Sequence, residues 1–379
     1  MTLANWREPP FSRWAFRHVR EIVPSAHIGT GGRTWRLARE ARPLERIALE
    51  APDGREMTVS QLLEESHSHG LVVLKGGQIV YERYDGGHDA ETPHIVFSVS
   101  KSVTGLVAGI LAERRLLDHD APVSRYLPEA QGSAYGDCTV RHVLDMTVAV
   151  EFEESYLDPK GVFARYRVAT AWNPPVQAGE VLDLRNFLVE LKRAKGRHGE
   201  AFRYASPNSD LLGWVLERAS GLRLAKLLST FLWRPMGAEF DAYVTVDRLG
   251  AARSAGGICM SLRDMARVGE LMRCFGLAGG RQVVPAWWVD DILANGDREA
   301  WVKGDLRQLL PHGRYRSQWY LTGNDHCALC AIGIHGQWIY IDPVAAVVIA
   351  KQSAQALPVD DRLDQLHLRV FDAIARGIR

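Results

Sequence analysis

The stretch from His94 to Leu111 reads HIVFSVSKSVTGLVAGIL, an apolar segment that runs directly into a pattern typical of a helix. Val, Leu and Ile recur in it at the spacing of one helix face, which predicts a buried helix. Ser98 and Lys101 form the pattern S-x-x-K at the start of this helix. Residues three apart are neighbours on a helix surface, so we expect the Lys101 amine beside the Ser98 hydroxyl.

Nucleophilic catalysis explains why a serine and a lysine would stand together in this way. An unaided serine hydroxyl is a weak nucleophile and needs an adjacent base. The positive partial charge of a helix N-terminus also favours negative charge that develops near Ser98. The alternative is that Ser98 caps the helix and Lys101 is solvated, because so short a motif also occurs by chance.

A second motif precedes another predicted helix, which begins near Ser209 and ends at Gly221. The segment YASPN (204–208) places Tyr204 two residues before a short polar side chain. If Tyr204 faces Lys101, the lysine cation lowers the pKa of the phenol, and Tyr204 can take and return a proton. The alternative is a core tyrosine with a satisfied hydroxyl.

A third motif, GIHGQ (333–337), enters a predicted strand late in the chain. Glycines in such a position let the backbone approach a ligand closely. We expect a backbone N–H from this strand, together with the N–H of Ser98, to hold an oxyanion. His335, Gly336 and Gln337 are the candidate pocket residues, and a purely structural histidine is the alternative for His335.

Strand patterns lie near both ends of the chain, and helical patterns crowd its centre. The predicted strands are 71–74, 78–84, 314–321, 337–341 and 344–350. A C-terminal helix carries an apolar stripe from Leu363 to Ile374. We therefore predict a sheet-containing domain of residues 1–95 and 258–379, a mostly helical domain of residues 96–257 inserted in it, and a site at the seam.

The composition excludes several classes of protein. Forty-six basic and 45 acidic residues give a net charge of +1, so no overall field attracts nucleic acid or an anionic membrane. The five cysteines are an odd number and predict no disulfide framework. The start MTLANWREPP lacks the pattern of a secretory signal, and we expect a cytoplasmic protein.

One cysteine spacing, Cys327-x-x-Cys330, is of the kind found in metal sites. A zinc site usually needs a second pair of ligands at a recognisable distance, and none is evident in the sequence. We therefore interpret this segment as an ordinary loop and expect no metal.

Longer segments of the sequence resemble a known family. SVSKS, YASPNSDLLGWVLE, GGICMSLRDMARVG and RSQWYLTGN resemble the 6-aminohexanoate-dimer (nylon-oligomer) hydrolases, within the serine β-lactamase-like, penicillin-recognising superfamily. The resemblance implies an α+β, β-lactamase/transpeptidase-like fold, with a central antiparallel sheet flanked by helices plus an inserted helical domain. It also implies acyl transfer through a covalent serine intermediate without metal or cofactor, with Ser98 as nucleophile, Lys101 as its base and Tyr204 as proton shuttle.

The resemblance further implies residues that bind substrate. Tyr156 matches a tyrosine that contacts the scissile amide nitrogen, Trp172 matches a tryptophan on a loop that closes over substrate, and Trp319 lies in a matching segment. Arg167 stands where relatives active on the nylon dimer can carry a carboxylate, so it could pair with a substrate carboxylate but not with an ammonium. Ala255 stands where they carry a polar residue. These two departures favour short acyl esters over the nylon dimer.

The sequence thus predicts a serine hydrolase that cleaves amide or ester bonds of a small molecule. One alternative is a family VIII-type carboxylesterase or a β-lactamase without nylon-oligomer activity. Another is a catalytically silent binding protein on the same scaffold. We expect no nucleic-acid or membrane partner, and a homodimer is compatible with the sequence.

Overall fold

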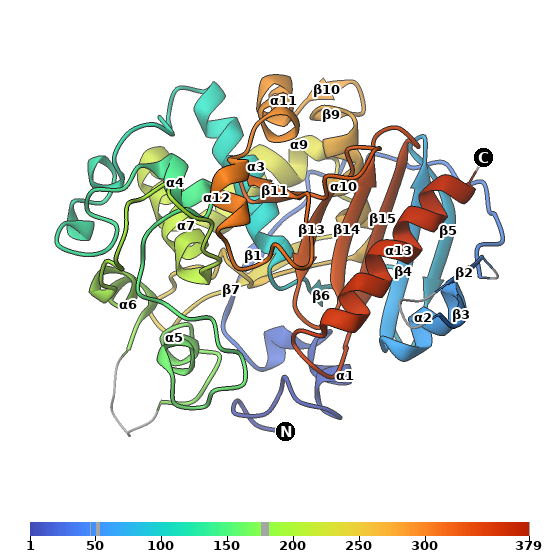
Figure 1. The fold of residues 1–379 in the computed structure, drawn as a ribbon, viewed down its shortest axis with the longest axis horizontal. Helices are drawn as coiled ribbons and strands as arrows, with labels where there is room; N and C mark the ends of the chain where they lie inside the picture. The colour runs from blue at the N-terminus through green and yellow to red at the C-terminus, as the bar shows by residue number, and fades with distance from the viewer. Residues whose placement is uncertain (46, 51–53, 176–181, 379) are drawn as a thin grey trace.

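The largest element of the fold is a seven-stranded antiparallel sheet of order β11-β12-β13-β14-β15-β4-β5. It is seen in a computed structural model that describes residues 1–45, 47–50, 54–175 and 182–378. Both ends of the chain supply strands, as Figure 1 shows by their blue and red colours. The strands are β4 (Ser68–Lys75), β5 (Gln78–Tyr84), β11 (Arg314–Arg316), β12 (Trp319–Leu321), β13 (Leu329–Gly333), β14 (Gln337–Asp342) and β15 (Val347–Ser353).

Helices cover both faces of this sheet. Helix α10 (Leu262–Arg273) packs on one face and α13 (Asp361–Gly377) on the other (Figure 1). Side chains of a strand alternate between the two faces. On β15, Val348 therefore lies in the core shared with α10, and Ile349 lies in the core beneath α13. The α+β architecture, with an antiparallel sheet flanked by helices, is the one expected.

Two of the predicted strands differ from those observed. The predicted strand 344–350 begins only at Val347, because residues before it form a turn in which Val344 is 66% exposed and Asp342 accepts the Ala345 N–H at 2.7 Å. The predicted strand 314–321 is two paired strands, β11 and β12. Ser317 and Gln318 between them have φ values of 48° and 71°, a left-handed conformation that ends a strand.

The middle of the chain is mostly helical. Its α-helices are α3 (Val99–Glu113), α4 (Val140–Leu144), α5 (Val162–Ala169), α6 (Leu184–Glu190), α7 (Ser206–Ser220), α8 (Leu224–Leu227) and α9 (Arg234–Met236). A second sheet, of order β1-β7-β8-β6, joins this segment to residues from both flanking segments. Its strands are β1 (Ser25–Ile28), β6 (His94–Ile95), β7 (Ala242–Thr245) and β8 (Ile258–Met260). The division into domains at 95/96 and 257/258 stays a prediction.

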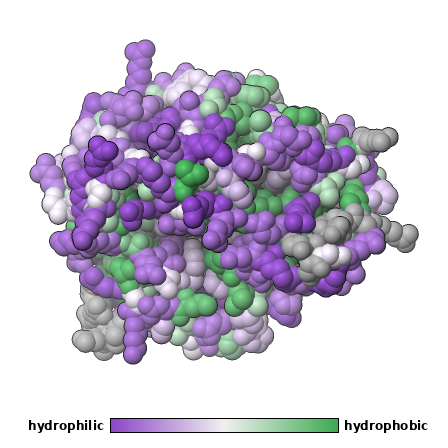
Figure 2. Space-filling model, viewed as in Figure 1, coloured by the Kyte–Doolittle hydropathy of each residue, from purple (hydrophilic) through white to green (hydrophobic). Residues whose placement is uncertain are grey.

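Apart from helices of the 3-10 and π type, the remaining elements are short α-helices and strands. They are α1 (Ser12–Ala15), β2 (Ala48–Glu50), β3 (Glu56–Thr58), α2 (Val59–Glu65), β9 (Leu277–Ala278), β10 (Arg281–Gln282), α11 (Ala286–Ala294) and α12 (Arg298–Val302). Hydrophilic residues cover most of the face in Figure 2, and apolar residues lie among them in small groups, as is usual for a surface in water. Among the described residues, no helix is long and apolar enough to span a bilayer.

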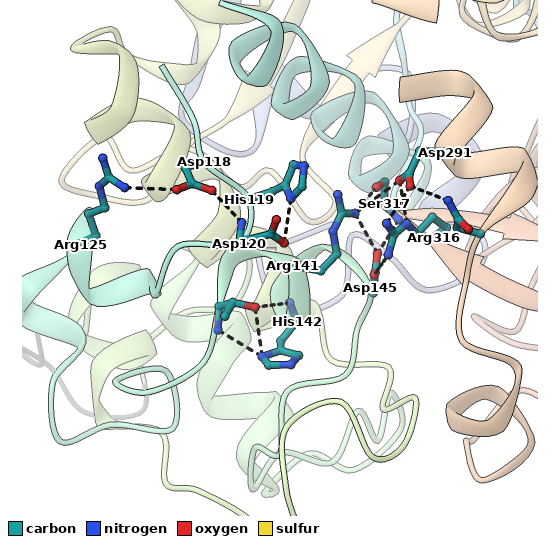
Figure 3. A network of polar contacts seen from close by, with 12 residues as sticks. Asp118, His119, Asp120, Arg125, Arg141, His142, Asp145, Asp291, Arg316 and Ser317 are labelled. Carbon is teal, nitrogen blue, oxygen red and sulfur yellow. Dashed lines mark hydrogen bonds and ion pairs between the residues drawn. The ribbon is translucent and has the colours of Figure 1, made fainter. Parts of the chain in front are cut away.

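A network of charged side chains holds the turn between β11 and β12 (Figure 3). Arg316 donates to Asp291 on α11 and to Asp145 at the end of α4, at 2.7 Å in each case. Arg141 on α4 donates to the Ser317 hydroxyl at 2.7 Å. The network therefore fixes the turn between two helices.

The turn between β11 and β12 also supports α3. The Ser102 hydroxyl donates to the backbone oxygen of Gln318 at 2.6 Å. A Cβ added to Gly105 would lie 2.4 Å from the backbone oxygen of Ser317, so only glycine lets the helix and the turn approach this closely. The position of α3, and of the S-x-x-K motif on it, depends on this contact.

Gly105→Ala tests the contact by the sign of its effect on stability. In an unobstructed helix, alanine would stabilise the protein by about 1 kcal/mol over glycine. The overlap with Ser317 should reverse this, and we expect the free energy of unfolding to fall by about 1–3 kcal/mol. Urea unfolding followed by circular dichroism measures it, and a gain in stability would show that the contact is not tight.

Candidate active site

Helix α3 brings Ser98 and Lys101 together as the spacing predicts. Lys101 Nζ lies 2.8 Å from Ser98 Oγ, and both side chains are buried. Ser98 directly precedes the first residue of α3 but forms no capping hydrogen bond through its side chain, so its hydroxyl is available for other chemistry. The preceding residue, Phe97, has a φ of 42°, which is a strained backbone conformation for an aromatic residue.

Lys101 has three neutral oxygens as its nearest partners. Its amine contacts Ser98 Oγ, Ser206 Oγ at 3.1 Å and the backbone oxygen of Ala255 at 2.7 Å. Burial lowers the pKa of Lys101 to about 8, although the charge of Glu154 acts in the opposite direction. A substantial share of the amine is therefore unprotonated at mildly alkaline pH, as a general base requires.

Tyr204 completes this group from the segment before α7. Its side chain is hydrogen-bonded to those of Ser98 and Tyr320, and Lys101 Nζ lies 5.0 Å from its ring centroid. The expectation that Lys101 lowers the pKa of Tyr204 is wrong, because burial and then the charge of Glu154 raise that pKa. Tyr204 is consequently a neutral phenol, able to pass a proton on but not a standing phenolate.

Helix α7 begins at Ser206, three residues earlier than predicted. Its first residue is bound by Glu154, which was not among the residues predicted from the sequence. Glu154 accepts both the N–H and the hydroxyl of Ser206, each at 2.7 Å. It also accepts the Tyr156 hydroxyl at 2.6 Å. The one feature of the sequence that pointed to Glu154 was its place two residues before Tyr156. It lies in an acidic segment, however, and acidic side chains in such segments are ordinarily solvated.

A second buried carboxylate fixes the other side of Lys101. Asp210 on α7 accepts the Ala255 N–H at 2.7 Å and is paired with Arg253 and with the Tyr166 hydroxyl. Ala255 was expected to bind substrate, but its side chain is buried and its backbone oxygen receives the Lys101 amine. The structure thus places Ala255 behind the lysine, where it orients the amine.

A cavity of about 410 Å³ opens onto Ser98, and Tyr156, Tyr204 and Tyr320 line it. The end of β13 closes one wall with Gly333 and Ile334. A Cβ at Gly333 would lie 3.2 Å from the Ser98 backbone nitrogen and 2.6 Å from the backbone oxygen of Val96. Glycine at 333 therefore lets the strand end lie directly against Ser98.

The three residues expected at the oxyanion pocket lie beyond this wall. His335 and Gly336 form the turn from β13 to β14, and both have left-handed φ values. Gln337 is buried, and its amide donates to backbone oxygens of the turn and to Ser353. His335 Nδ1 contacts the Gln355 backbone oxygen at 2.8 Å, and burial lowers its pKa to about 4, so it is a neutral wall residue.

The four residues expected to contact substrate by resemblance alone, besides Ala255, are placed differently from one another. Tyr156 lines the cavity, and Arg167 lines a second cavity beside it. Trp319 is fully buried in the main core, and its neighbour Tyr320 faces the cavity, because successive strand residues point to opposite faces. Trp172 is also buried and packs against Phe97 beneath the strained backbone.

The two cysteines of the C-x-x-C segment lie in different surroundings. Cys330 is buried within β13, and Cys327 is exposed in the turn before it. Over the described ranges, no group of three or more His, Cys, Asp or Glu side chains could hold a metal ion.

Comparisons with known proteins agree with this geometry. The chain is 38% identical over 353 residues to 6-aminohexanoate-dimer hydrolase of Paenarthrobacter ureafaciens, covering 93% of this chain and 88% of that protein. It is 30% identical over 210 residues to Esterase EstB of Burkholderia gladioli, about half of each chain. A solved structure from Bacillus anthracis, named as a candidate 6-aminohexanoate-dimer hydrolase, superposes with a TM-score of 0.90 at 26% identity over 99% of this chain and 96% of that one.

These likenesses bear out the predicted β-lactamase/transpeptidase-like fold and the predicted enzyme class. Solved structures of lower identity, such as a family VIII carboxylesterase at 16% and a TM-score of 0.59, share the fold alone. The model of the family described as Beta-lactamase matches residues 55–371. With Ser98, Lys101 and Tyr204 in mutual contact beside one cavity, this chain belongs to the β-lactamase family and is a serine hydrolase of that fold.

Proposed function

We propose that this serine hydrolase cleaves amide and ester bonds through an acyl group carried on Ser98, in the manner of a 6-aminohexanoate-dimer hydrolase that also accepts short acyl esters. The observation that carries the proposal is the Ser98 hydroxyl 2.8 Å from a buried lysine amine whose pKa is lowered to about 8. A hydroxyl beside a largely desolvated base is the arrangement that nucleophilic catalysis needs.

In the acylation step, Ser98 Oγ attacks the substrate carbonyl carbon and its proton passes to Lys101 Nζ. The carbonyl oxygen takes up negative charge, and the backbone N–H groups of Ser98 and of Ile334 are the proposed donors to it. This assignment is supported by the close approach of Gly333 to the Ser98 nitrogen. This second donor was expected in the segment 333–337, with the last three residues of that segment as candidates. The proposed donor, Ile334, lies in the same segment but just before those three.

The leaving group then needs a proton. Tyr204, hydrogen-bonded to Ser98, is the proposed relay that carries the proton from Lys101 to the leaving nitrogen or oxygen as its bond to the carbonyl carbon breaks. Tyr156 is proposed to contact the scissile amide nitrogen, since it lines the same cavity. In the second step water attacks the acyl carbonyl carbon and gives a proton to Lys101, the bond from that carbon to Ser98 Oγ breaks as Oγ takes up the proton, and the acid is released.

Glu154 is proposed as a positioning residue. Its carboxylate holds Ser206, which in turn contacts Lys101, and it holds the Tyr156 hydroxyl on the cavity wall. Its negative charge also raises the pKa of Lys101 against the effect of burial. One side chain thus sets both the direction and the basicity of the proposed base.

The proposed function can be distinguished from its two alternatives, a β-lactamase and a silent binding protein, by the reaction that is measured. Nitrocefin turnover that exceeds ester turnover would indicate a β-lactamase. A silent binding protein would gain nothing from a buried lysine with a lowered pKa beside a serine, since desolvating an amine is costly. We further propose a small-molecule substrate and a cytoplasmic location, which the five unpaired cysteines support. A homodimer would appear in light scattering at about twice the mass of one chain.

Ser98→Ala should abolish hydrolysis of p-nitrophenyl butyrate, because no other group can form the acyl intermediate. In the unaltered protein, a fluorophosphonate probe should add once per chain, and peptide mass analysis should place the adduct on Ser98. Ser100→Ala, a neighbouring serine whose hydroxyl contacts the Ile258 N–H, is the matched control and should keep the adduct. Near-normal turnover by Ser98→Ala would sink the proposal.

Glu154→Gln should alter the pH dependence of ester hydrolysis. In the unaltered enzyme kcat/KM rises with pH through about 8, because Lys101 is a base only when unprotonated. Removing the charge of Glu154 lowers the pKa of Lys101, so the rising limb should move to lower pH. The plateau should fall about tenfold, because Ser206 and Tyr156 lose a charged acceptor.

The exposed Glu151 of the same segment supplies the control variant, Glu151→Gln, which should leave the limb in place. A limb that stays at the same pH in Glu154→Gln, with only a lower plateau, would reduce Glu154 to a structural support.

A further inference from the structure

A second cavity, of about 260 Å³, adjoins the catalytic one, and Tyr156 and Pro358 line both. Arg7 from the N-terminal segment and Arg167 from α5 line its inner part. Figure 1 shows the N-terminal segment and α5 near the same edge of the molecule. The cavity lined by the two arginines therefore shares Tyr156 with the cavity that opens onto Ser98.

Neither guanidinium has a carboxylate partner. Within the described ranges, Arg7 and Arg167 form no ion pair with a carboxylate. Arg7 donates instead to the Trp172 backbone oxygen at 2.8 Å and to Asn173 Oδ1 at 2.5 Å. The guanidinium of Arg167 lies over the ring of Phe163, 4.6 Å from its centroid.

Arg7 is buried, Arg167 is half-buried, and their charges repel each other. Burial lowers the pKa of both, to about 10 in Arg167, and the charge of Arg167 contributes to the lowering in Arg7. The carboxylates on the cavity wall, Glu8 and Asp158, are exposed. His335, on the inner wall, is neutral, with a pKa lowered to about 4. Holding two cations without a carboxylate partner where water is largely excluded is costly to a fold, and an incoming anion would reduce that cost.

The charge in the catalytic cavity has the opposite sign. Its wall carries Glu153, Glu154, Asp305 and Asp361, together with Asp364, whose pKa burial raises to about 7, and Arg203 is the one cation among the described lining residues. A negatively charged substrate group would be repelled there. In the neighbouring cavity such a group meets Arg7 and Arg167, and the carboxylates on that wall, Glu8 and Asp158, are exposed to solvent.

We propose that Arg167, with Arg7 beside it, forms a subsite for a substrate carboxylate, so that the preferred substrates are amides or esters that carry a carboxylate at a distance from the scissile bond. The inference rests on the proposed function for the reaction itself. A guanidinium binds a carboxylate through two parallel N–H donors, which gives the subsite direction as well as affinity. Substrate would pass Tyr156, with its carbonyl at Ser98 and its carboxylate in the second cavity.

The carboxylate could belong to the acyl part or to the leaving part, and two pairs of substrates distinguish these. Mono-p-nitrophenyl adipate against p-nitrophenyl hexanoate places the charge on the acyl part. N-hexanoyl-6-aminohexanoate against its carboxamide places it on the amine part. In each pair the ratio of kcat/KM for the anionic to the neutral compound measures the contribution of the carboxylate.

Arg167→Gln should lower that ratio at least tenfold in one of the pairs, mainly through KM, and Arg167→Lys should restore part of it. The control is Arg165→Gln on the same helix, where the exposed Arg165 pairs with Glu190, and it should leave both ratios unchanged. Unchanged ratios in Arg167→Gln for both pairs would overturn the subsite.

Binding measured without turnover keeps this test separate from the proposed reaction. Adipamate and N-hexanoyl-6-aminohexanoate are titrated calorimetrically into Ser98→Ala and into Ser98→Ala/Arg167→Gln. We expect at least one to bind about tenfold more weakly to the double variant, with an affinity that falls as salt rises. Equal affinities would overturn the subsite, whereas a protein without a Ser98 adduct that still binds these anions through Arg167 would overturn only the proposed reaction.

Discussion

The site depends on one physical constraint, the removal of the Lys101 amine from water without a directly bound carboxylate. Its nearest partners are two hydroxyls and a backbone oxygen, all neutral. The carboxylates of Glu154 and Asp210 are hydrogen-bonded to Ser206 and Ala255 and not to the amine, although their charges raise its pKa. Burial therefore outweighs their attraction, the charged form is disfavoured, and the amine becomes a base near neutral pH.

The fold supports this arrangement at two close approaches. Gly105 lets α3 lie against the turn after β11, and Gly333 lets the end of β13 lie against the Ser98 nitrogen. The left-handed backbone at Phe97 stores strain just before the nucleophile, and buried aromatic rings pack around it. Sites of this kind give up some stability so that a reactive group is held in one position.

What the sequence predicted well was local. The contact of Ser98 with Lys101 follows from helix spacing alone, and the strand-rich ends with a helical centre follow from periodicity. Glu154 could not be predicted in this way, because its partner Ser206 is 52 residues away and only the fold joins them. Trp319 and Tyr320 show a different limit, since which of two adjacent strand residues faces a cavity depends on the register of the strand.

The pKa of Tyr204 shows the same limit for electrostatics. Its direction is decided by burial and by Glu154, and neither is visible in a motif of five residues. Charge placement around the site is likewise a property of the fold, since the whole chain is nearly neutral while one cavity is acidic and its neighbour is lined by two arginines. Substrate choice therefore depends on local groups.

The central claim is that burial lowers the pKa of Lys101 so far that a substantial share of the amine is unprotonated at mildly alkaline pH, and its titration tests this most directly. Lysine labelled with ¹³C at Cε, with the Lys101 signal assigned by its loss in Lys101→Arg, reports the protonation of Nζ by NMR. The account predicts a midpoint at about pH 8. A midpoint near the ordinary lysine value of 10.5 would contradict it, because the amine could not then act as the base for Ser98.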